Sequence, residues 1–175
     1  MSETLFTTAR LAARELLPED APFYMELLND ADFKRYIGDR GVRTLELALQ
    51  HLEARVFSSY DAHGFGMWHI SRRSDNRAVG IAGLVKRDFL DEVDLGYALL
   101  PAARGLGYAT EAGQGVMDYA RDHFSLRRLA AIISLDNNAS VRVLERLGFQ
   151  RQGEVSFPDG GDRCDYYLAE LTGLS

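Results

Sequence analysis

The sequence predicts a mixed α/β domain, and three observations support this fold class. Apolar residues alternate with polar residues in some segments, as in strands, and recur at helical spacing in others. These segments follow one another in the order β-α-α-β-β-β-α-β-α-β-β, which differs from a regular βαβ repeat and from an all-β barrel. The 175 residues, of which 46% are hydrophobic, suffice for one domain over residues 1–175 with a sizeable core.

The N-terminal half is predicted to contain a strand, two helices and a hairpin. Apolar and charged residues nearly alternate at 9–17, and prolines open the segment that follows. Thr44 is the predicted N-cap of a helix whose apolar residues recur at helical spacing. In chain order we expect a strand at 9–17, a helix from Pro18 to about Leu28, an irregular segment at 30–41, a helix from Thr44 to before Gly64, and strands at 65–73 and 78–87 joined by a polar turn.

The C-terminal half is predicted to alternate strands and helices before a closing pair of strands. Gly96 lies inside a predicted strand, where glycine often marks a bulge or a close approach of another backbone. Gly148 ends the last predicted helix. In chain order we expect a strand at 92–100, a helix at about 107–124, a strand at 127–135, a helix at 137–149, and strands at about 150–156 and 164–171.

Composition and charge argue against several functional classes. The net charge is −6, whereas nucleic-acid-binding proteins are usually basic, so DNA or RNA is not expected as the main partner. Cys164 is the only cysteine, and no intrachain disulfide is possible. The N-terminus lacks the features of a signal peptide, and no run is long and apolar enough for a membrane helix. We therefore expect a cytoplasmic protein without a membrane partner.

A loop with two glycines follows the strand at 92–100 and leads into the next helix. The first N–H groups of a helix lack intrahelical partners and, together with the helix dipole, favour an anion. Gly105 and Gly107 leave room for a phosphate at the backbone, and Arg104 is a candidate for a charged contact. The loop lacks the G-x-x-x-x-G-K-[ST] and G-x-G-x-x-G patterns of other phosphate loops. By itself it is equally consistent with a tight turn for helix–strand packing.

Two motifs in the expected order resemble the GNAT family of N-acetyltransferases. Residues 104–109, RGLGYA, match its R/Q-x-x-G-x-G/A signature, and residues 137–149 match its N-x-x-S-x-x-x-L-x-x-x-G-F segment. Residues 94–112 are similar to the branch that acetylates the N-termini of ribosomal proteins (RimJ/RimL-like). The resemblance implies the GNAT fold, which is a central, mostly antiparallel, twisted sheet of about six to seven strands, splayed in the middle and flanked by about four helices.

The resemblance implies acetyl-coenzyme A as co-substrate. The loop backbone would bind the pyrophosphate, and free backbone groups of the strand at 92–100 would pair with the pantetheine arm. Asn137 would contact the coenzyme through its side chain, although asparagine is also a strong helix N-cap and both roles can hold together. The residues assigned to the coenzyme are Tyr97, Ala98, Leu99, Arg104, Gly105, Leu106, Gly107, Tyr108, Ala109, Asn137 and Ser140.

The family transfers the acetyl group by direct attack of an amine on the thioester. The amine must therefore lose a proton, and the leaving thiolate must gain one. Asp94 occupies a position at which many relatives carry Glu, and it is a candidate base acting through water. Glu92 is a second candidate, because it lies two residues earlier and so on the same strand face. For each, a solvated strand end is the alternative, with a water chain as base.

The acid that protonates the thiolate departs from the common family pattern. Many relatives carry a tyrosine where this chain has Leu144, so that phenol is absent. Ser140 matches the serine that the ribosomal-protein branch is proposed to use instead, with helix capping or a contact to the coenzyme alone as its alternative. Tyr97 and Tyr108 are weaker candidates.

The acceptor implied by the family is a primary amine, either a protein N-terminus or a small amine. Phe33 and Tyr36 are candidate walls of its pocket, whereas Trp68 is expected in the core. An acidic chain suits a cationic acceptor by long-range attraction. Cys164 lies outside both motifs and is expected to be a packed residue, because unactivated thiols are mostly protonated. The four histidines form no dense ligand set, so no metal site is expected.

These observations predict an acetyl-coenzyme-A-dependent N-acetyltransferase that works through a ternary complex. A non-catalytic coenzyme-A-binding sensor or interaction module is the alternative, because Leu144 removes the usual acid. Transfer of a longer acyl group such as succinyl is a third possibility. A homodimer, which is common among relatives, is a further expectation.

Overall fold

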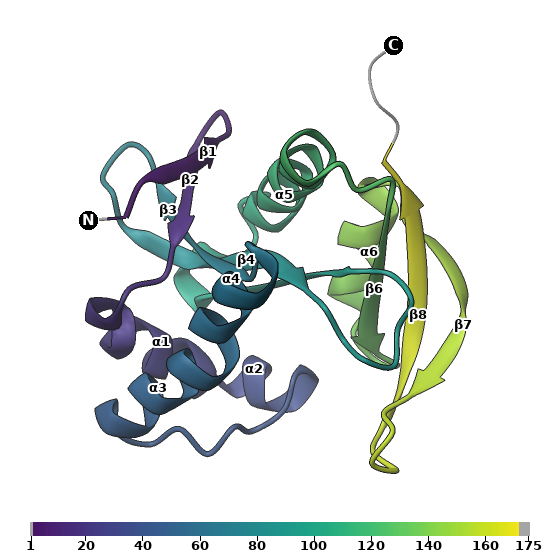
Figure 1. Cartoon of the computed structure of the whole chain (residues 1–175), viewed down its shortest axis with the longest axis horizontal. Helices are drawn as coiled ribbons and strands as arrows, with labels where there is room; N and C mark the ends of the chain where they lie inside the picture. The colour runs from purple at the N-terminus through teal and green to yellow at the C-terminus, as the bar shows by residue number, and fades with distance from the viewer. Residues whose placement is uncertain (1, 172–175) are drawn as a thin grey trace.

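An eight-stranded sheet runs through the molecule and opens into two arms (Figure 1). The computed structural model describes residues 2–171. The strands lie in the order β1-β2-β3-β4-β5-β6-β8-β7, and all described neighbours are antiparallel except β5 and β6. The strands are β1 (Thr4–Thr7), β2 (Leu11–Glu15), β3 (Met67–Arg72), β4 (Ala78–Val85), β5 (Asp94–Leu99), β6 (Arg128–Ser134), β7 (Gln150–Ser156) and β8 (Arg163–Glu170).

Helices cover both faces of the sheet and enclose two hydrophobic clusters. β4 contributes Leu84 to the cluster under α5 and Ile81 to the cluster under α1 and α3, so this strand is buried on both faces. The helices are α1 (Ala21–Leu28), α2 (Ala31–Tyr36), α3 (Leu45–His51), α4 (Ser58–His63), α5 (Tyr108–Phe124) and α6 (Asn138–Arg146), with a π-helical turn at Leu52–Phe57 and 3-10 turns at Pro18–Asp20 and Pro101–Ala103.

The mixed α/β class and the predicted order of elements are confirmed, with two additions. The segment at 30–41, which was expected to be irregular, contains α2. Asp30 caps this helix by accepting hydrogen bonds from the amides of Asp32 and Phe33, each at 3.2 Å. Six residues are too few for apolar periodicity to show, so the cap and one buried residue, Phe33, stabilise the helix. The expectation of an irregular segment was wrong for this part.

β1 is the second addition and raises the number of strands from the expected six or seven to eight. It is an edge strand with no fully buried residue, which weakens the alternation that identifies a strand. Its Phe6 approaches α5 at Gly115, where an added Cβ would lie 2.5 Å from the ring. An added Cβ at Gly113 would lie 2.6 Å from Leu147. Both helical glycines therefore permit close packing.

The sheet divides between β5 and β6. These parallel strands pair only at Asp94 and Ala130, whereas β5 is paired with β4 along the whole length of β5. Beyond Asp94 the two strands separate, and this confirms the splayed sheet. Gly96 does not mark a bulge, because it lies opposite Gly83 in regular register. The expectation of a bulge at Gly96 was therefore wrong. The alternative, a close approach of another backbone, is not seen either, because the atoms nearest to an added Cβ belong to the side chains of Met67 and Val85. The opening lies on the β6 side of the strand.

Candidate functional site

The glycine loop forms a cradle of backbone amides at the start of α5. Gly105 and Gly107 have φ angles of +76° and +83°, in the left-handed region that favours glycine. Gly107 is the N-cap of α5, and it has no side chain that could accept hydrogen bonds from the first amides of the helix. The first helical hydrogen bond joins the amide of Glu111 to the carbonyl of Gly107 at 3.1 Å. The amides before Glu111 are consequently available to an anion.

Glu111, which would oppose an anion at this helix start, is neutralised by Arg10. Its carboxylate accepts hydrogen bonds from the Arg10 side chain at 2.7 Å and from the Thr8 hydroxyl at 2.5 Å. Burial alone would raise the pKa of Glu111, but these bonds outweigh burial and hold the pKa below its usual range. Arg10 also donates to the carbonyl of Leu106 at 2.9 Å and stacks over Tyr108.

Arg10 is a residue that sequence reasoning missed. It lies on the short turn between β1 and β2, about a hundred residues from the loop that it contacts, and nothing in its local sequence indicates the contact. Of the other loop residues, Leu106 is exposed, Tyr108 is buried and Ala109 is half-buried. Arg10, which lies outside the loop, therefore stabilises the loop conformation, and the loop backbone stays accessible.

Arg104 has a different environment from the one predicted. Its guanidinium pairs with Asp30 and with Asp32, the latter at 3.1 Å, and donates to the carbonyl of Leu99 at 2.9 Å. These contacts fasten the N-terminus of α2 to the glycine loop. The other end of α2 is fastened to β6, where the Ser134 hydroxyl donates to the carbonyl of Tyr36 at 2.5 Å. α2 thus bridges the two arms, and a contact of Arg104 with the coenzyme stays a prediction.

One edge of β5 has no strand partner along the opening. Tyr97, Ala98 and Leu99 pair with β4 on one side, and no described residue of β6 pairs with them on the other. A backbone edge of this kind can accept an extended chain carrying amide groups. The unpaired edge ends near the glycine loop, because only the 3-10 turn at Pro101–Ala103 separates the two. The structure therefore places the residues predicted for the pantetheine arm and the pyrophosphate next to one another.

Two hydroxyl groups meet across this opening. The Tyr97 hydroxyl donates to the Ser140 hydroxyl oxygen at 2.8 Å, so β5 and α6 are joined there. Burial raises the pKa of Tyr97, and the bond to Ser140 opposes that effect in part. Asn137 caps α6 by accepting the amide proton of Ser140 at 3.2 Å. Leu144 lies in the core with 1% of its surface exposed. A phenol therefore lies at the opening on β5, whereas α6 has the apolar Leu144 at the position where many relatives carry tyrosine.

Asp94 is buried at the point where β5 and β6 separate. Its side chain accepts a hydrogen bond from Arg87 at 3.1 Å through Oδ2, whereas Oδ1 has no partner among the described residues. Burial raises the pKa of Asp94 to about 6, against the opposing effect of Arg87. A solvated strand end is therefore the wrong interpretation for Asp94. Its unpaired buried oxygen has room in its hydrogen-bonding shell for a water or a ligand.

Glu92 does not share this environment. It precedes β5, is half-buried, and lies 3.9 Å from Arg128. The expectation that Glu92 and Asp94 occupy one face of a strand was wrong, because β5 begins only at Asp94. The two carboxylates, which were predicted to lie together, thus have different environments, and only the Asp94 carboxylate is in a low-dielectric one.

The residues predicted near the acceptor divide between core and surface. Phe33 is buried with 8% of its surface exposed and belongs to the cluster under α1 and α3. Tyr36 is half-buried, with the Arg35 guanidinium 4.8 Å from its ring centre. Trp68 has 1% of its surface exposed, which confirms it as core. Cys164 is also buried, and burial raises the pKa of its thiol. A role of Phe33 or Tyr36 in acceptor binding stays a prediction.

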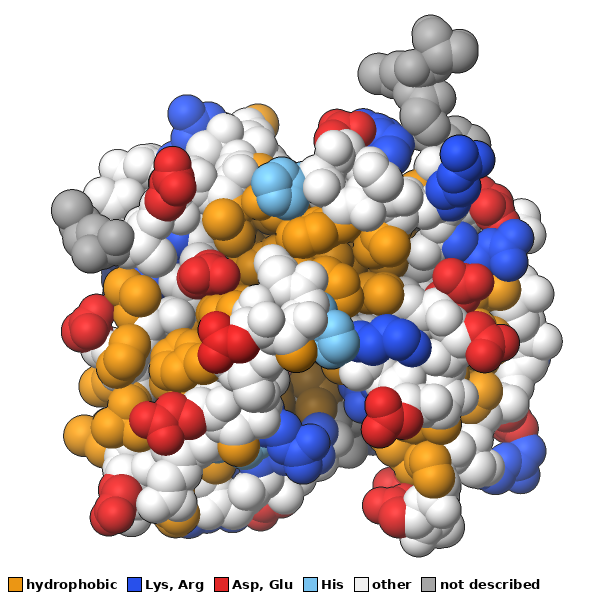
Figure 2. All heavy atoms as spheres, viewed as in Figure 1, with side chains coloured by type: hydrophobic (Ala, Val, Ile, Leu, Met, Phe, Trp, Pro, Cys, Tyr) orange, Lys and Arg blue, Asp and Glu red, His pale blue; other side chains and the backbone are white. Residues whose placement is uncertain are grey.

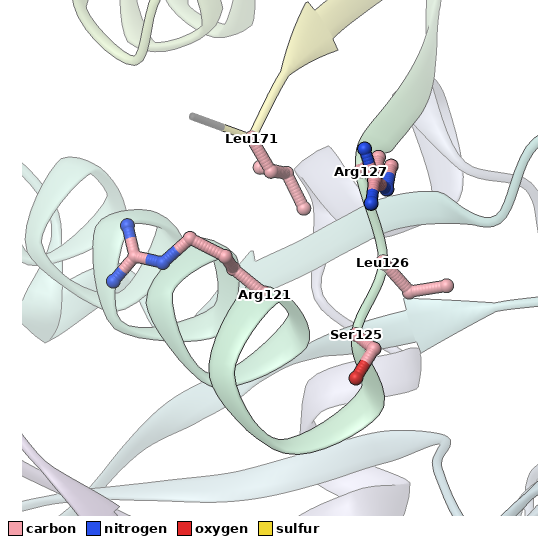
Figure 3. A pocket seen from close by; sticks show the side chains of 5 residues that line it. All are labelled: Arg121, Ser125, Leu126, Arg127 and Leu171. Atoms are coloured by element: carbon pink, nitrogen blue, oxygen red, sulfur yellow. The ribbon is translucent and has the colours of Figure 1, made fainter. Parts of the chain in front are cut away.

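Two surface hollows lie outside the opening of the sheet. One of about 340 Å³ is at the far end of α5 from the glycine loop, between the ends of α5 and β8, and its lining residues include Leu126 and Arg127 (Figure 3). The other, of about 640 Å³, runs along α5 beside β1 and has acidic side chains such as Asp118 in its wall. Neither contains Asp94, Tyr97 or Ser140. We therefore place the candidate site where β5 and β6 separate, beside Asp94 and the Tyr97–Ser140 hydrogen bond.

Other expectations concern metals and membranes. No three His, Cys, Asp or Glu side chains among residues 2–171 gather closely enough to hold a metal ion. Two of the histidines stack on aromatic rings, His63 on Phe65 and His123 on Tyr119. Within the described part of the chain, no helix is long and apolar enough to cross a membrane.

Comparison with known proteins points to one family. The family described as the acetyltransferase (GNAT) domain matches residues 10–150 of this chain. An uncharacterised N-acetyltransferase of Bacillus subtilis, YoaA, is 26% identical over 152 residues, which cover 85% of this chain and 84% of that protein. A second N-acetyltransferase of the same organism, YnaD, is 27% identical over 94% of this chain and 95% of that protein.

Solved structures show the same fold. An acetyltransferase from Agrobacterium tumefaciens superposes with a TM-score of 0.80 and 24% identity, covering 97% of this chain and 95% of that one. RimL, a ribosomal L7/L12 N-terminal acetyltransferase solved in complex with coenzyme A, also has a TM-score of 0.80, with 18% identity over 96% of this chain and 98% of that one. At these identities the likeness concerns the fold of the chain.

Proposed function

This chain belongs to the GNAT family of acetyltransferases and is an acyltransferase, and from that premise we propose that it moves an acetyl group from acetyl-coenzyme A directly to a primary amine. One observation carries the proposal: the left-handed glycine loop at the start of α5 adjoins the unpaired edge of β5. The first feature suits a pyrophosphate and the second an extended chain with amide groups. Together they fit the two parts of coenzyme A.

The proposed coenzyme contacts use backbone groups for the most part. The amides that follow Gly107 would hold the pyrophosphate, and the edge at Tyr97–Leu99 would hold the pantetheine arm. Asn137 keeps its side-chain NH2 group without a hydrogen-bond partner among the described residues, so it can cap α6 and contact the coenzyme at once. When bound, acetyl-coenzyme A supplies the reactive acetyl carbonyl as a thioester.

The transfer forms a bond between the amine nitrogen and the acetyl carbonyl carbon and breaks the carbon–sulfur bond. One proton leaves the amine and one must reach the thiolate. We assign the first to Asp94, because a carboxylate with a pKa of about 6 is ionised at neutral pH and still basic enough to accept a proton through water. We assign the second to the Ser140 hydroxyl, and Tyr97 donates a hydrogen bond that stabilises the resulting serine oxyanion. Asp94 then loses its proton to solvent and Ser140 regains one from solvent, so that both groups return to their starting states.

The acceptor is proposed to be a protein N-terminus or a small amine. The purified chain is to be incubated with acetyl-coenzyme A and a panel of free-amine peptides and small amines. We expect release of free thiol together with a product heavier by one acetyl group, and no release with the same peptides blocked at their N-termini. A panel-wide lack of thiol release and of acetylated product would count against the proposed function.

Replacing Ser140 by alanine is expected to lower kcat about 10-fold or more, because the thiolate loses its proton donor. Tyr97→Phe is expected to have a smaller effect in the same direction, since it removes only a hydrogen bond to Ser140. Steady-state kinetics measure both effects, and calorimetry with coenzyme A measures binding. We expect unchanged coenzyme affinity in each variant, which separates a proton donor from a residue that merely contacts the coenzyme.

The double variant provides the control for this pair. If Tyr97 acts through Ser140, the Ser140→Ala/Tyr97→Phe protein loses no more activity than Ser140→Ala alone. Fully additive losses, or a loss of coenzyme affinity equal to the loss of kcat, would refute the pairing.

A further inference from the structure

A loop from one arm of the sheet and a turn from the other meet beside the candidate base. The loop that joins β4 to β5 contains Arg87 and Phe89, and the turn that joins β7 to β8 contains Phe157. The ring centres of Phe89 and Phe157 lie 5.2 Å apart, and the Arg87 guanidinium lies 5.7 Å from the centre of the Phe157 ring. Arg87 also donates a hydrogen bond to Oδ2 of Asp94 at 3.1 Å. Arg87 thus contacts both the base and an aromatic ring of the opposite arm.

The backbone that carries Arg87 is held in a compact turn. The amide of Leu90 donates to the carbonyl of Arg87 at 3.3 Å, and the Lys86 ammonium group donates to the carbonyl of Leu90 at 2.9 Å. Leu90 is buried, with 5% of its surface exposed, and it anchors this turn in the protein. A guanidinium group that lies over an aromatic ring is further stabilised by electrostatic attraction to the ring face. Arg87 is therefore held both through its backbone and through its side chain.

The two oxygens of the Asp94 carboxylate have different environments. Oδ2 accepts the hydrogen bond from Arg87, whereas Oδ1 is buried and has no partner among the described residues. A buried oxygen of this kind is usually satisfied by a water or a ligand. Figure 2 shows a recess near the middle of the drawn face, between the helical half of the molecule and the arm of β6–β8, with hydrophobic side chains at its floor (compare Figure 1). Asp94 also lies between these two parts, where β5 meets β6, so a water that enters there is a suitable partner for Oδ1.

We propose that Arg87 is a positioning residue for the transfer reaction, which is held against Phe157, fixes Oδ2 of Asp94 and leaves Oδ1 to accept the proton of the amine through a water. The water takes one proton from the amine and passes one to Oδ1. The carboxyl group becomes neutral while Oδ2 keeps its hydrogen bond to Arg87. The inference rests on the proposed function, because it concerns the same base, and it adds the residue that orients this base and the oxygen that accepts the proton.

Arg87 also keeps the buried carboxylate ionised. Burial raises the pKa of Asp94 to about 6, and Arg87 has the largest opposing effect. Lys86, from the same loop, opposes burial less strongly, and the residues paired with Asp94 on β4 and β6 are the apolar Val85 and Ala130. Removal of the Arg87 charge should therefore raise the pKa of Asp94 further. A larger fraction of the carboxyl would then be protonated at neutral pH and unable to act as a base.

Three variants separate the charge of Arg87 from its geometry. Arg87→Gln removes both, so we expect the rise of kcat with pH to move upward by about one pH unit or more and the plateau of kcat to fall about 10-fold. Arg87→Lys keeps the charge but lacks the planar guanidinium that lies on Phe157, so the rise should stay near pH 6 while the plateau falls by a similar factor. Phe157→Leu should lower the plateau to a smaller extent and leave the rise in place. The KM for acetyl-coenzyme A should be nearly unchanged in all three variants, because these side chains lie outside the proposed coenzyme contacts.

Arg151→Gln is the matched control, because it removes an arginine from Asp165, another buried aspartate of the sheet. It should leave both the plateau of kcat and its pH profile unchanged. An Arg87→Lys protein with the kcat of the unmodified protein would overturn the positioning role, and so would an equal loss in Arg151→Gln. Thermal unfolding tests whether each variant is folded. If Arg87→Gln does not fold, Arg87→Lys and Phe157→Leu decide the question.

A spectroscopic titration tests the role of Arg87 separately from turnover. In protein labelled with a magnetic isotope at the aspartate carboxyl carbons, the Asp94 signal is identified by its absence in Asp94→Asn, and NMR follows its titration. We expect a midpoint near pH 6 in the unmodified protein, a higher midpoint in Arg87→Gln and an unchanged one in Arg87→Lys. An unmoved midpoint in Arg87→Gln would refute the inference even if acetyl transfer occurs. A moved midpoint without transfer to any amine would instead refute the proposed function and leave the effect of Arg87 on Asp94 supported.

Discussion

Asp94→Asn is expected to reduce kcat by about 100-fold or more while leaving KM nearly unchanged, because general base catalysis typically contributes 10²- to 10⁴-fold. The substitution keeps the size of a buried side chain and removes only its ability to accept a proton. In the unmodified protein, activity should rise with pH as the Asp94 carboxyl ionises near its pKa of about 6. A pH profile of kcat measures this, and the rise near pH 6 should disappear in the variant.

Two further variants separate catalysis from structure. Glu92→Gln should leave the pH profile of kcat unchanged. If Glu92→Gln instead removed the rise near pH 6 and Asp94→Asn kept it, Glu92 would be the base. Asp165→Asn is the matched control, since Asp165 is also buried and paired with an arginine, Arg151, at 2.9 Å. It should leave kcat unchanged. A loss of kcat equal to that of Asp94→Asn would indicate a general effect of removing a buried carboxylate.

The same shift in pKa predicts how stability depends on pH. Folding raises the pKa of Asp94, so the native state prefers the protonated form. The resulting stability is fully present below the unfolded pKa of about 3.9 and is lost as pH rises through about 6. Asparagine mimics the neutral form, so Asp94→Asn should be relatively more stable at pH 8 than at pH 4. Thermal unfolding at the two values measures the difference.

Gly107→Val is expected to weaken coenzyme A binding by at least about 100-fold, the effect of losing one or two hydrogen bonds to a charged group. A β-branched residue strongly resists a φ angle of +83°, so the loop must change conformation and its amides no longer converge. The new side chain would also meet Arg10, whose Nη2 lies 3.3 Å from the position of a Cβ. Calorimetry with coenzyme A measures the loss of affinity.

Gly148→Val is the matched control for backbone strain. Gly148 follows α6 and has a φ angle of +89°, and a Cβ added there would have no atom within 4 Å. It should therefore lower thermal stability without removing coenzyme affinity. Coenzyme binding that survives in a folded Gly107→Val protein would contradict our assignment of the pyrophosphate to this loop.

The order of the long elements could be read from the sequence, because their apolar periodicity reflects local burial. The predicted strand at 150–156 has the bounds of β7, and the helix at 107–124 differs from α5 by one residue. The short or exposed elements could not be read. β1 has no buried face to produce alternation, and α2 depends on a cap and one buried residue.

The candidate site likewise has parts that the sequence predicted and parts that it did not. The glycine loop and Asn137–Ser140 were identified from motifs, because each consists of neighbouring residues whose spacing carries the signal. Contacts between distant residues carry no such signal. Arg10 neutralises Glu111 from across the fold, Arg104 fastens α2 to the loop, and Tyr97 meets Ser140 across the opening.

The sequence by itself predicted the mixed α/β class, because periodicity reflects local burial, and the resemblance of two motifs predicted the family. That resemblance also implies that the glycine loop binds a pyrophosphate. Only the tertiary structure decided that Asp94 is buried whereas Glu92 is half-buried, because these residues, two apart in sequence, fall on opposite sides of a strand boundary. It also decided the charge beside that carboxylate. A net charge sums over the whole chain, whereas electrostatic interactions of this kind act over a few ångströms, where folding has placed Arg87 at 3.1 Å from Asp94.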